Sequence, residues 1–331
     1  MALQIMPHFF AHAVSMENQK REKQSKKPLK YLILVATSGD TGKAALEGYK
    51  DKEGISIIVF YPEKGVSKLQ ELQMTTQEGK NLKAFGVKGD FDDMQRIVKE
   101  VFNDKELSDQ LLKNHNTSLS SANSINWGRL LPQIVYHISS YLNLTQQKVI
   151  NFGDGIDIAV PTGNFGNILA AFYAKKMGLP VRKLICASNE NNVLTAFLKT
   201  GIYDISNRSL IKTPSPSMNI IDASNLERLL YEVTKDHKLI NKWMRQLKKN
   251  KKLEIDTKTK KVIRKIFYAD WVSNGDCLAT IKKVYKEADY LIDPHTAVAQ
   301  AVVERYQKKI NGNVPIVICS TAHWAKFPKD V

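Results

Sequence analysis

One seven-residue loop, Pro161-Thr-Gly-Asn-Phe-Gly-Asn167, constrains the fold of this chain more than any other segment. The residues before it, 156–160, have the apolar pattern of a buried strand, and those after it, 168–177, have the pattern of a helix. Gly163 and Gly166 allow a sharp turn and let a ligand approach the backbone, while the positive end of the helix dipole favours an anion. The loop therefore predicts a phosphate-binding turn between a strand and a helix.

A second polar loop, Thr37-Ser-Gly-Asp-Thr-Gly42, lies between a strand pattern at 31–36 and a helix pattern at 43–50. In open α/β sheets such loops leave the carboxyl ends of strands, where ligands bind. Two of them indicate one ligand held from two sides. The Gly-Lys pair that follows this loop also suggests an ATP-binding P-loop, but that motif requires Gly at position 37 and Ser or Thr at position 44, so ATP binding is rejected.

Strand and helix patterns alternate along the chain, which predicts an α/β fold with two lobes and mostly parallel sheets covered by helices. A leading helix over 1–15 and a polar linker over 17–28 precede the first strand, and Pro132 bends or delays a helix over 125–142. Further strands are expected at 55–60, 82–87, 184–187 and 314–320, and further helices at 67–78 and 91–102. The expected division is a leading segment at 1–30, a smaller lobe at 31–125 and a larger lobe at 126–331.

The net charge of +16 raises the question of nucleic-acid binding, above all over the Lys-rich run 245–265. That run contains no aromatic residue that could stack on a base, so a solvated basic face is the favoured interpretation. We therefore expect no nucleic-acid partner, and a basic nucleic-acid binder is kept only as a minor alternative.

The three cysteines, Cys186, Cys277 and Cys319, are too widely spaced for a disulfide framework or a zinc site, so we expect reduced thiols and no metal. No apolar run is long enough to cross a membrane. No basic residue precedes the first apolar stretch, as a secretory signal would require. The cytoplasm is therefore the expected compartment.

Four motifs occur in a fixed order along the chain, and together they resemble threonine synthase. They are Ala36-Thr-Ser-Gly-Asp-Thr-Gly42, Ser120-Ser-Ala-Asn-Ser-Ile-Asn-Trp-Gly-Arg129, Val160-Pro-Thr-Gly-Asn-Phe-Gly-Asn167 and Ser320-Thr-Ala-His-Trp-Ala-Lys-Phe327. Threonine synthases are pyridoxal phosphate enzymes with the tryptophan-synthase-β-like fold, fold type II, and the resemblance runs from Met1 to Phe327. It implies conversion of O-phospho-L-homoserine and water to L-threonine and phosphate, the last step of threonine biosynthesis.

The resemblance also implies a role for the residues of each motif. The residues expected to bind the cofactor, at its phosphate or beside its pyridine nitrogen, are Gly163, Asn164, Phe165, Gly166, Asn167 and Thr321. The residues expected to bind the substrate are Ser38, Gly39, Asp40, Thr41, Gly42, Ser121, Asn123, Ser124, Asn126, Arg129 and Lys326. His323 is also expected near the substrate phosphate, whereas His295 is interpreted as a structural histidine. Trp324 departs from the family pattern, which usually has a small residue or proline there.

Each of these assignments has a structural alternative. The alternative for 163–167 is an ordinary tight turn between a strand and a helix. For Asp40 it is an N-terminal cap of the following helix, and for 121–129 it is a capped helix start with a solvated Arg129.

The resemblance further implies a lysine that forms a Schiff base with the cofactor, in a Phe-Lys-Asp triplet that would lie immediately before Met1. The sequence also stops at Val331, short of the terminal helices of the family. We therefore expect a fragment clipped at both ends, with no catalytic residue of its own and negligible activity. Neither Lys43 nor Lys326 is expected to replace the missing lysine. The leading helix is expected to present one apolar stripe to a partner surface, formed by Ala2, Ile5, Met6, Phe9, Phe10 and Ala13.

The expected partner is a small-molecule substrate, with no membrane, and the expected assembly is a monomer or homodimer. Within the enzyme class, threonine dehydratase or another eliminating pyridoxal phosphate enzyme is the nearest alternative. Outside it, the alternative is a noncatalytic protein that retains a site for pyridoxal phosphate or another phosphate ligand.

Overall fold

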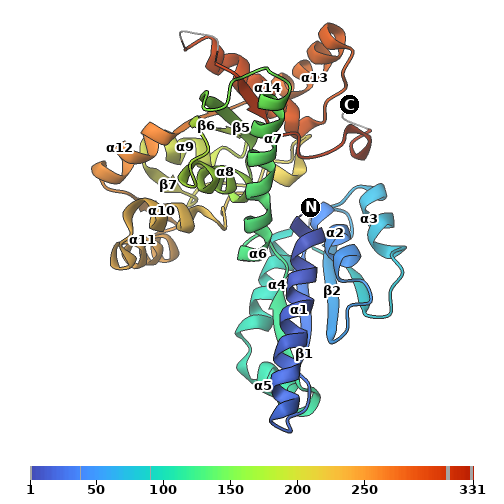
Figure 1. Ribbon diagram of the computed structural model, residues 1–331. Helices are drawn as coiled ribbons and strands as arrows, with labels where there is room; N and C mark the ends of the chain where they lie inside the picture. The colour runs from blue at the N-terminus through green and yellow to red at the C-terminus, as the bar shows by residue number, and fades with distance from the viewer. Residues whose placement is uncertain (1, 38, 90, 311–313, 329–330) are drawn as a thin grey trace. The chain divides into compact units, whose positions relative to one another are not determined.

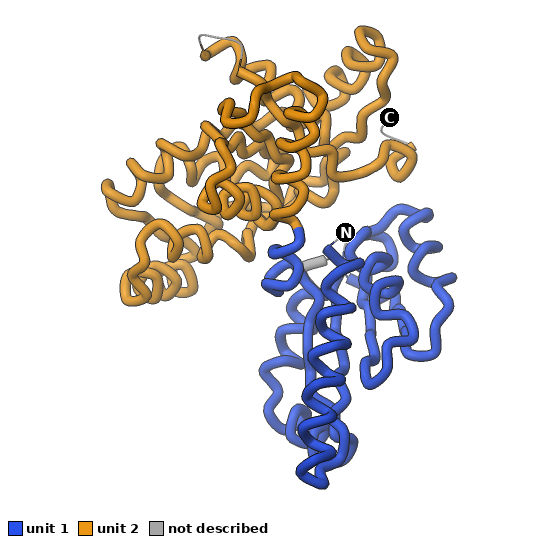
Figure 2. The backbone as a smooth tube through the Cα atoms, in the orientation of Figure 1, with its two compact units in different colours: residues 1–132 blue, residues 133–331 orange. Residues whose placement is uncertain are grey.

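The computed structural model describes residues 2–37, 39–89, 91–310, 314–328 and 331, with the backbone alone at 91 and 92. The chain divides into two compact units, Met1–Pro132 and Gln133–Val331 (Figure 2). We describe each unit by itself. The three segments expected from the sequence, 1–30, 31–125 and 126–331, remain a prediction.

Unit 1 is built on a four-stranded parallel sheet in the order β3-β2-β1-β4 (Figure 1). The strands are β1 (Lys30–Ala36), β2 (Ile55–Pro62), β3 (Leu82–Val87) and β4 (Thr117–Ser121). Val35 of β1 lies opposite Val59 of β2, and Leu34 lies opposite Ser121 of β4. Because the carboxyl ends of β1 and β4 are neighbours, the loops that follow them leave the same edge of the sheet.

Helices cover both faces of this sheet. They are α1 (Ala2–Lys23), α2 (Asp40–Tyr49), α3 (Lys68–Thr75), α4 (Phe91–Asn103), α5 (Lys105–His115) and α6 (Trp127–Leu130). Ile33 and Val35 pack in one core with side chains of α1, α2 and α3. Leu34 and Ala36 pack in a second core with side chains of α4. This alternation with a period of two explains why β1 is apolar on both faces.

The leading helix is longer than the sequence pattern predicts. Helix α1 continues to Lys23, so much of the expected linker at 17–28 is helical. Its buried residues are Leu3, Met6, Pro7 and Val14, whereas Phe9 is 66% exposed. The predicted stripe was therefore wrong in part: Phe10 packs against Tyr31 and Tyr49 as expected, whereas Phe9 and Ala13 are exposed.

Unit 2 is built on a second four-stranded parallel sheet, in the order β10-β5-β6-β9, beside a two-stranded antiparallel sheet (Figure 1). The parallel strands are β5 (Ile156–Pro161), β6 (Val181–Ser188), β9 (Phe267–Trp271) and β10 (Ile316–Ile318). The antiparallel pair is β7 (Ile202–Asp204) and β8 (Lys252–Glu254). On one face, Ala159 and Ile185 pack with side chains of the last two helices. On the other, Phe172 stacks on Phe267 with ring centroids 6.2 Å apart.

The helical segments of unit 2 include short turns that later bear on the site. The helices are α7 (Ile134–Gln146), α8 (Gly166–Lys176), α9 (Val193–Thr200), α10 (Leu226–Thr234), α11 (His237–Asn250), α12 (Thr257–Ile266), α13 (Asn274–Ala288) and α14 (Pro294–Gln307). The 3₁₀ turns of unit 2 are η2 (Pro216–Met218) and η3 (Trp324–Lys326), and a further turn, η1 (Leu131–Gln133), spans the boundary at residue 132. Most basic side chains of the run 245–265 are exposed on α11, α12 and the turn between them.

The α/β class with parallel sheets covered by helices is confirmed, and so is the break at Pro132, where η1 separates α6 from α7. Other predictions need correction. The helix expected at 43–50 already begins at Asp40, and the strand expected at 314–320 is limited to Ile316–Ile318. Helix α5 and strand β4 were missed, because the polar sequence of 105–121 has no clear apolar period. No helix of the described residues is long and apolar enough to cross a membrane.

Candidate ligand site

The turn between β5 and α8 leaves a run of backbone donors unused. Among the described residues, none of the N–H groups of 163–167 has a hydrogen-bond partner. No side chain caps the N-terminus of α8 either. Consecutive free N–H groups at a helix N-terminus form a concavity that suits an anion with several oxygens, such as a phosphate ester. The residues present therefore fit a phosphate, and we call 163–167 the cup.

The backbone of Phe165 gives the cup its shape. This residue lies in the left-handed region with φ 63°, directly before the first residue of α8. That conformation costs a non-glycine residue of the order of 1 kcal/mol or more. The phenyl ring is fully buried and lies 5.8 Å from the ring of Phe267, so core packing fixes the strained backbone. The side chain of Phe165 is therefore part of the core and not available to a ligand.

Hydrogen bonds from two other residues, Asn225 and His137, fix carbonyl groups of the cup. The carbonyl of Asn164 accepts hydrogen bonds from Asn225, from its backbone N–H at 3.2 Å and from Nδ2 at 3.0 Å. The carbonyl of Asn167 lies 3.2 Å from Nε2 of His137, a buried residue of α7. Burial lowers the pKa of His137 to about 4, so the ring is neutral near pH 7 and donates to this carbonyl. The carbonyls of Asn164 and Asn167 are thus engaged with the protein, while the N–H groups of 163–167 are left without a protein partner.

The second segment that was predicted to bind the cofactor follows the strand beside β5. Strand β10 pairs with β5 in parallel, with Ile318 opposite Ala159, and the N–H of Cys319 donates to the carbonyl of Ala159 at 2.9 Å. Thr321 is exposed three residues beyond this strand. It therefore leaves the same edge of the sheet as the cup. Lys326 is half-buried in η3, and His323 caps that turn by accepting the N–H of Ala325 at Nδ1.

In unit 1, the loop after β1 is organised by a buried hydroxyl. Thr37 Oγ1 accepts the N–H groups of Gly39 and Gly42, both at 3.0 Å, and donates to the carbonyl of Gly39. The side chain of Asp40 is held by Gln70 Nε2 at 3.1 Å. Gly39 has a φ of 151°, a backbone conformation that residues with a side chain rarely adopt, so glycine is strongly favoured there. Ser38, a predicted substrate residue, lies outside the described residues.

The N-cap position of α2 belongs to Gly39, and Asp40 is the first helical residue. The alternative that Asp40 caps this helix is therefore wrong. Thr41 is half-buried in the first turn of the helix. Lys43 pairs with Glu47 at 3.1 Å and also contacts Gln77, so its ammonium is engaged along the outer side of α2.

Asn123 joins the loop after β4 to the end of β1. Its Nδ2 donates to the carbonyl of Ala36 at 2.8 Å, and its Oδ1 accepts the N–H of Ala36 at 3.3 Å. Ser121 donates its hydroxyl to the same Oδ1 at 3.1 Å. The amide of Asn123 thus stands where the next peptide group of β4 would pair with β1, and it fixes the two predicted substrate segments to each other.

The rest of this block is partly committed to folding contacts. Asn126 is the N-cap of α6, where its Oδ1 accepts the N–H of Gly128 at 2.8 Å, and its Nδ2 donates to the carbonyl of Ser121. Arg129 is half-buried and donates from Nη1 to the carbonyl of Ala122 at 2.8 Å, so it is not a freely solvated side chain. Ser124 is half-buried beside them.

Some residues that shape the site were missed by sequence reasoning. Gln70 holds Asp40 across 30 positions, and Asn225 holds Asn164 across 61. Neither belongs to a local motif, because each acts on a loop that only the folded chain brings close. The described residues contain no group of three or more His, Cys, Asp or Glu placed to bind a metal ion.

Comparisons with known proteins show the family to which the chain belongs. The family described as "Pyridoxal-phosphate dependent enzyme" matches residues 11–321. Threonine synthase-like 1 from Homo sapiens is 47% identical over 333 residues, which cover 99% of this chain and 43% of that protein. The crystal structure of threonine synthase from yeast matches with TM-score 0.88 and 37% identity, covering 100% of this chain and 65% of that one.

The crystal structure of pyridoxal phosphate-bound threonine synthase from Brucella melitensis matches with TM-score 0.86 and 36% identity, covering 99% of this chain and 66% of that one. The chain thus spans less than half the length of the human relative and about two thirds of the two synthases.

Proposed function

The chain belongs to the pyridoxal-phosphate dependent enzyme family, and we propose that it carries the cofactor-binding and substrate-binding segments of a threonine synthase. Its fold is the tryptophan-synthase-β-like α/β fold of that family. The proposed substrate of the whole protein is O-phospho-L-homoserine, and the proposed products are L-threonine and phosphate. The cytoplasm stays the proposed compartment.

One observation carries the cofactor part of the proposal, namely the run of unpaired N–H groups at 163–167. In the proposed complex these groups bind the phosphate of pyridoxal phosphate, and the positive end of α8 adds to the attraction. The hydroxyl of Thr321 would lie beside the pyridine nitrogen. When bound, the cofactor supplies an electron sink for a carbanion at the amino-acid α carbon.

The substrate part of the proposal rests on unit 1. The loop that contains Gly39, Asp40, Thr41 and Gly42 and the block at 121–129 leave the same edge of its sheet, and they offer hydroxyl, amide and guanidinium donors. We assign substrate contacts to Ser121, Ser124 and Arg129, because an Arg fork can bind two phosphate oxygens at once. Asn123 and Asn126 belong to the same proposed substrate segment, and their amides also hold its shape through hydrogen bonds to backbone groups. Lys326 of unit 2 is proposed as a further substrate contact.

Binding of pyridoxal phosphate and of pyridoxal, each titrated into the purified chain by calorimetry, tests the cup. Pyridoxal lacks the phosphate, so we expect it to bind at least about tenfold more weakly, as the loss of charge-assisted hydrogen bonds implies. Equal affinity for the two compounds would contradict the proposal.

A matched pair of glycine substitutions separates ligand binding from folding. A Cβ at Gly166 would meet only Asn225 Nδ2 at 3.6 Å and Gln133 Nε2 at 3.9 Å, so Gly166→Ala fits the protein without a clash. Gly275, in the first turn of α13, has similar open space, with Ser273 Oγ at 3.8 Å. We expect G166A alone to weaken pyridoxal phosphate binding, because its methyl group takes space at the cup, while both variants unfold like the parent. Unchanged binding by G166A would count against the cup.

The reaction is tested separately with the full-length protein, by measuring threonine and phosphate release from O-phospho-L-homoserine. Cofactor binding without either product would favour the noncatalytic alternative. Ammonia and an oxoacid formed from threonine would favour the dehydratase alternative.

A further inference from the structure

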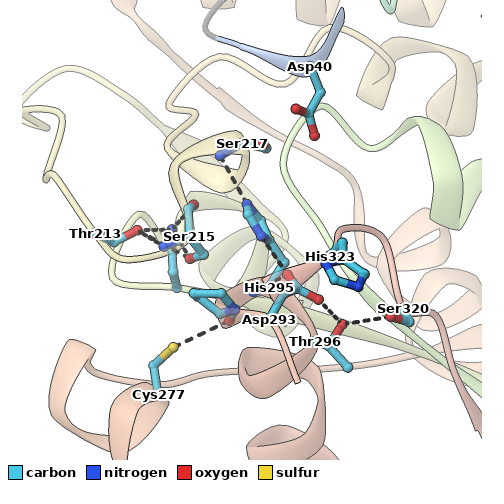
Figure 3. Close-up of polar contacts among 12 residues, drawn as sticks. Asp40, Thr213, Ser215, Ser217, Cys277, Asp293, His295, Thr296, Ser320 and His323 are labelled. Atoms are coloured by element: carbon cyan, nitrogen blue, oxygen red, sulfur yellow. Dashed lines mark hydrogen bonds and ion pairs between the residues drawn. The ribbon is translucent and has the colours of Figure 1, made fainter. Parts of the chain in front are cut away.

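A buried carboxylate and a buried imidazole form a pair at the start of α14 (Figure 3). Asp293 is the N-cap of this helix, and its Oδ1 accepts the backbone N–H of His295 at 2.9 Å. The same oxygen lies 2.8 Å from Nδ1 of the His295 ring. Both side chains are almost fully removed from solvent, at 2% exposure each. None of the functional assignments above uses this pair.

The contacts define which nitrogen of His295 carries the proton. Its Nε2 accepts the backbone N–H of Ser217 at 3.2 Å, so this nitrogen has no hydrogen of its own. The ring hydrogen is therefore on Nδ1 and is donated to Asp293. Burial alone would raise the pKa of Asp293, but hydrogen bonds from His295 and Thr296 keep it below its ordinary value. The pair is thus a carboxylate and a neutral imidazole in one fixed orientation.

The turn η2, whose Ser217 N–H is bound by His295, packs directly against Gly163. A Cβ atom built at Gly163 would lie 2.8 Å from the carbonyl oxygen of Ser217 and 3.2 Å from Cα of Met218. These are backbone atoms, which move only if the whole turn moves. The position of Gly163 in the cup therefore depends on the position of η2.

A second anchor keeps the rest of this segment in place. The Nδ2 group of the buried Asn189 lies 3.0 Å from Ser215 Oγ, 2.8 Å from Thr213 Oγ1 and 2.9 Å from Asn219 Oδ1, and its two hydrogens are shared among these acceptors. Loss of the contact with His295 would therefore loosen η2 without releasing the segment on which it lies.

The other oxygen of Asp293 is connected to the segment that carries Thr321. Oδ2 accepts the hydroxyl of Thr296, and Thr296 Oγ1 lies 3.3 Å from Ser320 Oγ (Figure 3). Ser320 directly precedes Thr321. The carboxylate of Asp293 is thus connected to η2 through His295, and to the segment that carries Thr321 through Thr296.

We propose that His295 is a positioning residue for phosphate binding, which holds η2 against Gly163 through the acceptor at Nε2 while Asp293 fixes the ring. The inference rests on the proposed function, because it takes the cup as the phosphate site. It assigns His295 no contact with the cofactor or substrate.

Two substitutions at this position separate the acceptor from the donor. The amide of Gln reaches the place of Nε2, so His295→Gln keeps an acceptor for the N–H of Ser217. The shorter Asn reaches only the place of Nδ1, so His295→Asn keeps a donor to Asp293 and loses that acceptor. Both variants lose the ring contact with Phe327, whose ring centroid lies 5.1 Å away, so they share the packing defect.

Hydrogen exchange read by mass spectrometry over residues 213–221 of the purified chain is the first measurement. In this segment the N–H of Ser217 depends on His295, and the N–H groups of Met218 and Asn219 bond within the turn. We expect H295N to exchange about fivefold to tenfold faster there, as for one lost hydrogen bond, and H295Q to stay near the parent. Similar exchange in H295N and the parent, or equal acceleration in both variants, would overturn the proposal.

The affinities for inorganic phosphate and pyridoxal phosphate form the second measurement. We expect both to weaken by about fivefold to tenfold in H295N and to recover in H295Q. If the parent chain binds neither compound, the proposed function fails, while the exchange data still decide whether His295 holds the turn. If H295N does not fold, Gly163→Ala replaces it, because the added Cβ pushes η2 from the opposite side. Unchanged exchange over 213–221 in G163A would equally refute the argument.

Discussion

Replacing Asn123 with Ala should destabilise unit 1 more than its half-exposed position suggests. The side chain makes two hydrogen bonds with the backbone of Ala36, which is 2% exposed, and accepts a third from Ser121. Removal leaves a buried N–H and a buried carbonyl at the end of β1 without partners. A hydrogen bond contributes about 1 kcal/mol net, and an unsatisfied buried group costs more, so N123A should lose about 2 to 4 kcal/mol.

The assay is urea unfolding with pulsed hydrogen exchange, read on peptides from β1 and β4 so that unit 1 is followed separately. Asn123→Asp is the informative companion, because it preserves shape and one acceptor but presents an oxygen to the carbonyl of Ala36. It should be at least as destabilising as N123A near neutral pH. Asn114→Ala, an exposed change on α5, serves as the control and should be close to neutral.

A loss below about 0.5 kcal/mol in N123A would refute the reasoning, because it would mean that the amide does not stand in for a strand peptide group. The predicted coupling between the two substrate segments would then lose its physical basis.

Two further predictions follow from buried titratable groups. The pKa of His137 is lowered to about 4 from 6.5 by burial, so the unfolded chain binds this proton first and stability should fall as pH drops from 6.5 to 4. In His137→Gln, the free energy of unfolding should fall by up to about 3 kcal/mol less over this pH range than in the parent. Urea unfolding of both proteins at several pH values measures the difference, and the same pH dependence in both would contradict the prediction. Burial raises the pKa of the Cys186 thiol to about 12, so at pH 8 only about one in ten thousand is thiolate. Cys186 should react with a disulfide reagent only after unfolding in urea, and rapid labelling of Cys186 in the native chain would show that it is accessible.

The cup was predictable because its determinants are local. A strand, two glycines and a helix within about 20 residues dictate that the chain turns at 161–167 and that a helix N-terminus follows. The same holds for the loop after β1. The sequence pattern does not reveal that Phe165 adopts a left-handed conformation, because that conformation depends on burial of its ring beside Phe267.

The apolar pattern of the sequence also gave wrong predictions where tertiary packing determines the structure. The apolar residues of α1 suggest a stripe containing Phe9, yet the helix buries Leu3 and Val14 instead, because the shape of the adjoining helix selects the face. The sequence pattern did not predict helix α5 and strand β4, because both are polar and have no clear apolar periodicity. Contacts with neighbouring elements of the fold hold them in place.

By itself, then, the amino-acid sequence determined the alternation of strands and helices, the parallel α/β class and the positions of the two polar loops, since all of these depend on periodicity and turn residues near one another in the chain. Only the tertiary structure decided what supports those loops. Gln70, Asn123, Asn225 and the pair Asp293 and His295 act on residues 30 to 87 positions away, and the last pair reaches Ser217 across 78. Hydrogen bonds between such distant residues leave no local pattern, because they exist only after packing of the core has brought the partners within reach.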